Sequence, residues 1–505
     1  MVPCLAILHH GDMARVGEVA LLTALAADRE VALSRLEPVF APLRKGASLP
    51  LGDPHLSRQP IWLKPLEGGG VRVDGCDAGT PLRVGGLALE GPLDISLEEL
   101  GKGVVLSLAQ RVLLYLHFVD PLPPQEVPQF DLVGQSSQMA EVREEIQRVA
   151  CRSIPVLVRG PTGSGKELVA QAIHRTGPRS SGPFVSVNMA AIPPSLAAAE
   201  LFGVVPGAFT GADRRRSGFF QQAHGGTLFL DEVGETPREI QALLLRALDE
   251  KEIRPVGGDV TRKVNVRVLA ATDLDLEEAI LGKNFLGPLF HRLAGYEIFL
   301  PPLKNRRQDI PLLLGHFLRQ ELEAMGCAHR LEARAAGASC WLPASLMERF
   351  LAYSWPGNVR QLRNLAQRLA VAFGDAEKIG TGWRLKRLLA STLGEKSSGR
   401  PLAAAHNSTQ QSTPQPSQIE ESELREVLRN HRWSLKPTAE ALGISRTSLY
   451  GLLEKFPGIR PAAKLGAQEI HVALENHDRD VTAAALELEV SKQGLLQRLR
   501  ELEIK

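Results

Sequence analysis

The stretch that decides the fold is Gly160-Pro161-Thr162-Gly163-Ser164-Gly165-Lys166-Glu167-Leu168. It fits the G-x-x-x-x-G-K sequence of a P-loop, whose glycines let backbone N–H groups curl around phosphate oxygens while the lysine meets the β- and γ-phosphates. The apolar run at 155–158 predicts a strand before the loop. The amphipathic run from Lys166 predicts a helix after it, whose N-terminus faces the phosphates. Glu167 departs from the generic motif, which has a Ser or Thr ligand for Mg²⁺ there.

Two acids farther along the chain complete this site. An apolar strand is predicted at 227–230, and it ends in Asp231 and Glu232. A strand-end pair of this kind is what a Mg²⁺-holding aspartate and a water-polarising glutamate need. The alternative is a glycine-rich turn with an unrelated acidic pair, and the presence of both features favours the phosphate site.

Working outward, helical and strand patterns alternate. Helices are predicted at 139–150, 166–176 and 237–249, and strands at 155–158, 227–230 and 264–271. This alternation predicts parallel βαβ units covered by helices, hence an α/β P-loop core at 130–300. Beyond about residue 300 the strands stop, and a helical domain is expected at 301–392.

Each end of the chain has its own texture. Short apolar runs at 71–73, 82–84 and 104–108, separated by turn residues, predict a β-sandwich at 1–125. Residues 393–420 are rich in Ser, Gln, Pro and Ala and are interpreted as a flexible linker.

The last 85 residues contain an internal repeat at an offset of 46. Glu423, Leu428, Ala439, Leu442, Ser445 and Leu449 recur as Glu469, Leu474, Ala485, Leu488, Ser491 and Leu495. The shared positions trace helix, turn, helix, so a duplicated all-α helix-turn-helix is predicted at 421–466 and 467–505.

Composition limits the remaining possibilities. The chain has 505 residues, 44% hydrophobic and 23% charged, with a net charge of +2, which excludes a disordered chain and a wholly basic nucleic-acid coat. Five cysteines without a C-x-x-C pair argue against a zinc site or a disulfide framework. With no apolar stretch of the ~18 residues that span a bilayer and no signal peptide, we expect a cytoplasmic, soluble protein.

Over about residues 130–372 the chain resembles the bacterial enhancer-binding proteins, the AAA+ activators of sigma-54 RNA polymerase. The segments that carry the resemblance are Leu132-Val-Gly-Gln-Ser-Ser-Gln-Met139, Gly165-Lys-Glu-Leu168, Asn188, Glu200-Leu-Phe-Gly203, Gly207-Ala-Phe-Thr-Gly-Ala212 and Trp355-Pro-Gly-Asn-Val-Arg360. The family tolerates a glutamate at position 167.

The resemblance implies an ATPase with ATP and Mg²⁺ as cofactors. Lys166 and the rest of 160–168 would hold the phosphates, and Asp231 the Mg²⁺. Glu232 would activate water, restrained by the switch residue Asn188. Thr272 and the sensor Arg360 would complete the ATP site, and Arg292 would act in trans within a ring, a hexamer in this family.

The loop Gly207-Ala208-Phe209-Thr210-Gly211-Ala212 is the most specific signal. In the family this GAFTGA loop extends toward the polymerase, and its Phe and Thr touch sigma-54. ATP hydrolysis itself does not require such a loop, so Phe209 and Thr210 are the expected contacts. The alternative is a glycine-rich turn with one buried Phe.

Three positions depart from the family. Leu286 and Pro288 stand where it has an arginine and an aspartate, and Asp273 replaces an asparagine near the γ-phosphate. A trans arginine can contribute 10³ to 10⁵ in rate. We therefore predict a functional but slow ATPase. The rival hypotheses are an ATP-responsive DNA-binding regulator without turnover, and an AAA+ remodeller of another protein.

The N-terminal region resembles a forkhead-associated domain, a β-sandwich that binds phosphothreonine. Ser57-Arg58 is similar to its S-R motif, 77–80 to its N-G-T, and Arg35 or Arg44 to its early arginine. This implies a phosphothreonine protein or kinase as partner, in a two-component-like signalling chain. Since the family's histidine is here Pro60, a silent sandwich that makes domain contacts is the alternative.

Residues 438–450 resemble a Fis-type helix-turn-helix that binds upstream enhancer DNA. Ser445 would cap the second helix, and the residues that face DNA would be Arg446, Thr447, Ser448 and Tyr450. Residues 421–466 contain 8 basic and 5 acidic residues, whereas 467–505 contain 5 and 8. We therefore predict that the first repeat reads DNA and that the second packs or dimerises.

Overall fold

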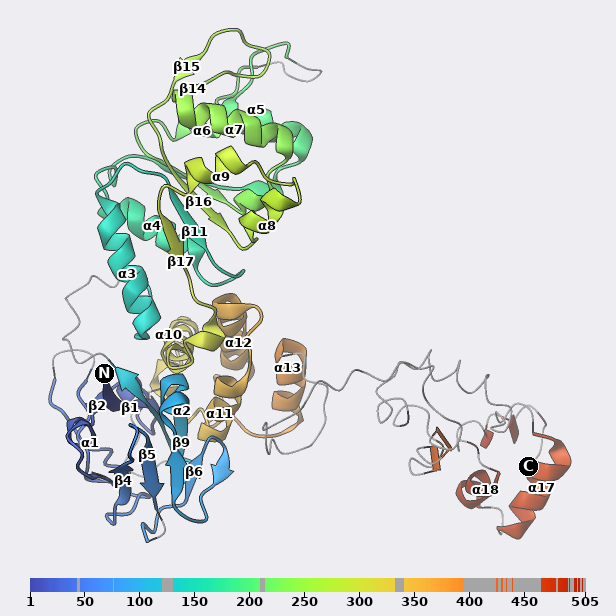
Figure 1. Ribbon diagram of the computed structural model, residues 1–505. Coiled ribbons are helices and arrows are strands. Elements are labelled where there is room, and N and C mark those ends of the chain that lie inside the picture. Colours follow the sequence, from blue (N-terminus) through green and yellow to red (C-terminus); the bar gives the residue numbers. More distant parts are fainter. Residues whose placement is uncertain are drawn as a thin grey trace. The chain divides into compact units, whose positions relative to one another are not determined.

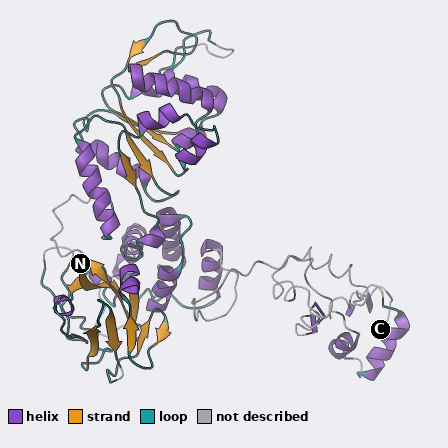
Figure 2. Cartoon of the chain, viewed as in Figure 1, coloured by secondary structure: helices purple, strands orange, loops and turns teal. Residues whose placement is uncertain are grey.

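The computed structural model describes residues 1–42, 46–75, 77–119, 130–208, 214–331 and 340–393. In the C-terminal part it describes mainly 465–477 and 480–488, with single positions elsewhere. The chain divides into two compact units, Met1–Ala403 and Ala404–Lys505, and each is described by itself. Within the first unit, Figures 1 and 2 show a strand-rich part, a mixed α/β part and a helical part.

The strand-rich N-terminal region predicted from the sequence is present, as two antiparallel sheets. The larger sheet has the order β2-β1-β10-β9-β6-β7, and the smaller has β3-β4-β5-β8. The strands are β1 Val2–His9, β2 Val19–Leu21, β3 Val31–Leu33, β4 Ile61–Pro65, β5 Val71–Asp74, β6 Leu82–Val84, β7 Leu87–Ala88, β8 Leu93–Ile95, β9 Val104–Leu108 and β10 Val112–Val119. The short helices are η1 Met13–Arg15, α1 Thr23–Ala26 and α2 Leu97–Lys102.

Alternation along β1 and β10 places apolar side chains on both faces of the larger sheet. Leu5 and Ile7 of β1 lie in the core between the two sheets. Ala6 and Leu8 of the same strand lie in a different core, which the helical part supplies. Both strands are therefore buried on two faces.

The α/β part contains five parallel strands in the order β12-β13-β16-β11-β17. They are β11 Val156–Arg159, β12 Phe184–Asn188, β13 Thr227–Asp231, β16 Arg267–Thr272 and β17 Glu297–Phe299, beside a hairpin of β14 Glu252–Ile253 and β15 Arg262–Lys263. The parallel sheet was predicted, but β12 and β17 were not. The predicted strand at 264–271 begins only at Arg267, where pairing with β13 starts.

Helices cover both faces of this sheet. They are α3 Ser137–Ala150, α4 Lys166–Thr176, η2 Met189–Ala191, α5 Pro194–Phe202, α6 Phe219–Gln222, η3 Val233–Glu235, α7 Arg238–Glu250, α8 Leu276–Leu281 and α9 Gly287–Leu293. Phe229 of β13 packs with α3 and α4, whereas Leu228 and Leu230 pack with α5, α7 and α9. This alternation explains the continuous apolar run at 227–230, since a central parallel strand is buried on both faces.

The helical part consists of η4 Leu303–Asn305, α10 Asp309–Ala324, η5 Ala328–Arg330, α11 Ala344–Ala352, α12 Asn358–Phe373 and α13 Trp383–Leu393. A buried carboxylate joins it to the α/β part. Asp309 is fully buried and accepts hydrogen bonds from Gln135 N (2.6 Å), Ser136 N (2.9 Å) and Ser136 Oγ (2.6 Å). These three donors balance the cost of burying a charge, so the first residues of α3 and α10 are fixed to each other.

In the second unit the structure describes α17 Ala467–Asn476 and α18 Val481–Glu487. Their shared core contains Ile470, Leu474, Ala485 and Leu495, which are positions of the predicted repeat. Within the described residues, no helix is both long and apolar enough to cross a bilayer.

Candidate functional site

The P-loop lies between β11 and the first turn of α4. Gly160, Gly163 and Gly165 all have positive φ angles, and at Gly163 a Cβ atom would lie 2.6 Å from Gly357 O. Only glycine fits this backbone between the two parts of the molecule. Lys166 is the first residue of α4 and is 6% exposed.

Lys166 meets the strand-end acids predicted from the sequence. Its Nζ lies 3.1 Å from Gly160 O and 3.4 Å from Glu232 Oε1. Asp231 ends β13, and Glu232 follows it with a φ of 52°. The lysine and both acids therefore gather at the carboxyl edge of the sheet, where ligands bind in open α/β folds.

Asp273 joins this group. Its carboxylate accepts a hydrogen bond from Thr162 Oγ1 of the P-loop and shares another with Glu232. Thr272, beside it, accepts from Gly160 N through its backbone oxygen at 3.3 Å. Asp273 is one of the departures from the family noted in the sequence, and the structure places its carboxylate between Thr162 of the P-loop and Glu232.

Burial raises the pKa of Glu232; Lys166 opposes this shift, and the hydrogen bond with Asp273 adds to it. Burial also acts to raise the pKa of Asp273, but the hydrogen bonds from Thr162 and Glu232 outweigh it and leave that pKa lowered. The hydrogen bond between the two carboxyl groups therefore acts in opposite directions on them, raising the pKa of Glu232 and lowering that of Asp273.

The Mg²⁺ expectation is consistent with the donors present. Ser164 Oγ is buried and, in the described part of the chain, has no hydrogen-bond partner. No group of three or more His, Cys, Asp or Glu side chains suited to a metal occurs in that part. Mg²⁺ typically takes one or two carboxylates together with phosphate oxygens, and Asp231 at the end of β13 is such a carboxylate.

The sequence did not single out the residues that attach the helical part (η4 to α13, here called the lid) to the P-loop. Asn358 Nδ2 donates to Thr162 O at 3.0 Å, and Asn358 Oδ1 accepts from Leu303 N at 2.8 Å. Arg306 donates to Ser164 O at 3.1 Å. Asn358 stands inside Trp355-Pro-Gly-Asn, so the motif itself was the available signal.

Three predicted residues have other contacts. Asn188 pairs with Asp231 in the sheet register, but its Oδ1 accepts from Ala190 N and caps η2. Arg360 is exposed on α12, and its backbone N–H donates to Gly163 O. Arg292 Nε lies 2.9 Å from Asp249 Oδ1, so its guanidinium is engaged within its own chain.

Glu167 and Leu168 are exposed on α4, next to Lys166. Of the predicted sigma-54 loop, Gly207 and Ala208 are described, while Phe209, Thr210, Gly211 and Ala212 lie outside the described residues. The ends of the loop are anchored, since Val204 bridges both Arg216 and Val256. The loop therefore starts beside the β14–β15 hairpin.

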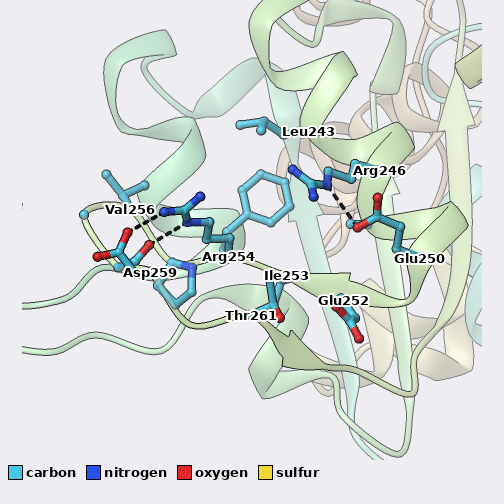
Figure 3. A pocket seen from close by; sticks show the side chains of 14 residues that line it. Leu243, Arg246, Glu250, Glu252, Ile253, Arg254, Val256, Asp259 and Thr261 are labelled. Atoms are coloured by element: carbon cyan, nitrogen blue, oxygen red, sulfur yellow. Dashed lines mark hydrogen bonds and ion pairs between the residues drawn. The ribbon is translucent and has the colours of Figure 1, made fainter.

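A hollow of about 470 Å³ opens next to this anchor. Figure 3 shows its walls, which come from α7, the hairpin and Phe202. Ion pairs join Arg246 to Glu250 at 3.0 Å and Arg254 to Asp259 at 2.5 Å. The hollow is lined by charges of both signs and holds no residue of the nucleotide site.

In the sandwich the predicted phosphothreonine residues lie together. Ser57 N donates to Thr80 Oγ1 at 2.8 Å, and Ser57 O accepts from Arg35 N at 3.1 Å. Arg58 is exposed beside them. Arg44, the alternative to Arg35, lies outside the described residues, as do the predicted DNA-facing residues Ser445, Arg446, Thr447, Ser448 and Tyr450.

Models of three known protein families match successive parts of the chain. Residues 132–299 match the Sigma-54 interaction domain. This match is followed by a match to the AAA+ ATPase lid domain at 304–382 and by one to the Fis family of bacterial regulatory proteins at 415–456. The predicted order of AAA+ core, lid and C-terminal helix-turn-helix is therefore confirmed.

The chain is also similar to several bacterial regulators. The chain is 39% identical over 330 residues to the DNA-binding transcriptional activator HyfR of Escherichia coli, covering 65% of this chain and 47% of HyfR. It is 46% identical over 266 residues to NtrC of Azospirillum brasilense, covering 51% and 53%. The chain thus spans about half the length of these relatives. Among solved structures it is similar to NtrX of Brucella abortus in complex with ADP, at 32% identity and a TM-score of 0.47, covering 66% and 70%.

The position of Asp273 generates a prediction for Asp273→Asn. The amide keeps an acceptor for Thr162 but removes a negative charge that faces a bound terminal phosphate. At about 1 kcal/mol for one charge pair near water, ATP affinity should rise roughly fivefold, and turnover should rise with it. Fluorescent-nucleotide titration and steady-state hydrolysis measure both quantities.

Asp275→Asn is the matched control, because Asp275 caps α8 by accepting from Glu278 N and asparagine caps equally well. Unchanged or weaker ATP binding in Asp273→Asn would contradict the role given to this carboxylate.

Proposed function

We propose that this chain is an ATP-driven transcriptional activator. It binds upstream DNA and uses ATP hydrolysis to remodel sigma-54 RNA polymerase for promoter opening. The observation that carries the proposal is the gathering of Lys166, Asp231, Glu232 and Asp273 at the P-loop of a domain that matches the Sigma-54 interaction domain. A further support is the intact loop at 207–212, rooted beside the hairpin.

Each residue of the site has a role in this proposal. Backbone N–H groups within 162–166 and the Lys166 side chain bind the triphosphate, and Thr162 and Arg360 lie at its edge. Asp231 and Ser164 would hold Mg²⁺, which when bound supplies charge neutralisation at the phosphates. Glu232 accepts a proton from the attacking water. Thr272 positions the P-loop through Gly160.

Assembly into a ring, a hexamer by resemblance, is part of the proposal. Arg292 is the arginine that would act in trans, and it must leave Asp249 to do so. This exchange costs little because the pair is about half exposed, and exposed ion pairs contribute on the order of 1 kcal/mol or less. With Leu286 in place of a second arginine, turnover is expected to be slow.

A binding-only regulator is the second candidate, and the Asp273–Glu232 contact favours it, since it engages the carboxyl group that would activate water. Hydrolysis by the wild type separates the two candidates. Undetectable hydrolysis at high protein concentration, with and without target DNA, would leave only the regulator without turnover.

Three variants test the activator. Lys166→Ala should lose nucleotide binding, and Glu232→Gln should bind ATP but hydrolyse it about 10² to 10⁴ times more slowly, as expected for loss of a general base. Thr210→Ala should hydrolyse ATP and fail to open a sigma-54 promoter. Hydrolysis and promoter opening are measured side by side, and full promoter opening by Thr210→Ala would contradict the assigned contact.

DNA binding is assigned to the first C-terminal repeat and packing or dimerisation to the second. The core of α17 and α18 supports a packing role, and Arg498 of this repeat donates to Leu465 O, just before the repeat begins. Deleting 467–505 should weaken self-association and, through it, DNA affinity, whereas Arg446→Ala should weaken DNA binding alone. Sedimentation and DNA titration measure these effects. A deletion that changes neither quantity would refute the division.

The N-terminal sandwich is proposed to bind a phosphothreonine of a partner protein or kinase. Arg35, Ser57, Arg58 and Thr80 form the site, because an arginine with a hydroxyl donor is suited to a phosphate. Arg58→Ala should weaken binding of a phosphothreonine peptide by about tenfold, in line with one lost charge-assisted hydrogen bond. The control Arg29→Ala removes an exposed arginine elsewhere on the sandwich. Equal binding of phosphorylated and unphosphorylated peptides would contradict the proposal.

A further inference from the structure

The outer face of the larger sheet of the N-terminal sandwich packs against the lid instead of facing solvent. Four side chains on its outer face, Ala6, Leu8, Leu113 and Tyr115, lie in one apolar core with the lid helices α10, α11 and α12. Figure 1 shows the blue strands beside these helices. Tyr115 and Leu113 are at most 7% exposed. The sandwich and the lid therefore share a core, as two parts of one domain do.

The segment His9–Arg15, here called the connector, makes the polar contacts on the lid side. His9 Nε2 lies 2.8 Å from Leu342 O, and Cys340 Sγ donates to His10 O at 3.8 Å. Met13 fills the space over Gly315 of α10, where its Cε lies 3.9 Å from the position that a Cβ atom would take. A larger side chain at position 315 would displace Met13.

The same connector holds a second segment on its other side. Leu49–Asp53, here called the strap, receives hydrogen bonds from Arg15 at three successive carbonyls, Leu49 O (3.1 Å), Pro50 O (2.8 Å) and Leu51 O (2.9 Å). The guanidinium is neutralised by Glu18 at 2.7 Å. His10 Nε2 adds a contact of 3.0 Å to Leu51 O.

The contacts made by the connector and the strap extend to the P-loop on the lid side and to the predicted phosphothreonine site on the sandwich side. On the lid side, Asn358 and Arg306 hold the P-loop through Thr162 O and Ser164 O. On the sandwich side, the strap leads into Leu56, whose N–H donates to Asp53 O, and then into Ser57 and Arg58. Packed and hydrogen-bonded segments therefore run without interruption from the P-loop to the predicted phosphothreonine site.

We propose that the sandwich moves with the lid as one body and that the connector couples the nucleotide state of the P-loop to the strap. The inference rests on the proposed nucleotide site and assigns a regulatory contact to it. By linkage, a ligand that fixes the strap changes nucleotide affinity by the same factor that nucleotide changes the affinity for that ligand. The sandwich then changes position whenever the lid does, unlike a domain attached only through a flexible linker.

Hydrogen exchange of the full-length chain tests the coupling. Saturating ADP or a non-hydrolysable ATP analogue should change exchange in peptides that cover 46–58 several-fold, because Leu49 N and Gly52 N are bonded within the sandwich. Two independent variants remove the lid contact. Met13→Asp puts a charge in the apolar core, and Gly315→Leu adds atoms beyond Cβ that compete with Met13 for its space while favouring the helix over glycine.

Both variants should bind nucleotide with unchanged affinity yet show no response in the strap. The matched controls Met325→Asp and Gln320→Leu introduce the same residues at exposed positions in and just after α10, and they should respond as the wild type does. A fluorescent nucleotide measures binding separately. A wild type that binds no nucleotide contradicts both proposals, whereas bound nucleotide without a response in the strap, or a full response in Met13→Asp and Gly315→Leu, overturns this inference alone.

Discussion

The side chain of Asn358 is the interaction on which the arrangement of the first unit depends. It is buried at the seam, accepts from Leu303 N at the start of the lid and donates to Thr162 O in the P-loop. Each polar atom lost from such a site would leave a buried partner unpaired, at about 1 to 3 kcal/mol. Through these two hydrogen bonds a movement of the lid would act on Thr162 of the P-loop.

Electrostatics at the other wall of the site depends on three side chains. Lys166, Glu232 and Asp273 form one cluster. Lys166 is the positive charge of these three side chains, and both acids interact with it. A bound triphosphate would compete with Glu232 for Lys166 and so weaken the ion pair that holds this acid. The replacement of an asparagine by Asp273 makes this cluster more sensitive to its ligand than a neutral residue would.

Sequence reasoning reached the parts whose chemistry is local. The glycines and Lys166 specify a P-loop by themselves, and the apolar run at 227–230 with two terminal acids specifies a central strand. The three-residue β17 and the strand β12, whose exposed Ser186 interrupts the apolar pattern, gave too weak a signal. The seam at Asn358 and the contact of Met13 with Gly315 join residues hundreds of positions apart, which no spacing reveals. Yet the unbroken apolar runs of β1 and β10 did carry a signal, because a sheet face exposed to water would alternate.

The shared core of sandwich and lid changes how alleles of this gene are to be interpreted. A truncation that removes the first 125 residues takes away the strands that share an apolar core with Leu314 and Leu318. It therefore exposes an apolar surface as well as removing the proposed input domain. Constitutive activity or inactivity of the shortened protein then reports folding and solubility together with regulation. Missense changes in the connector, which leave that surface covered, are the cleaner genetic tools.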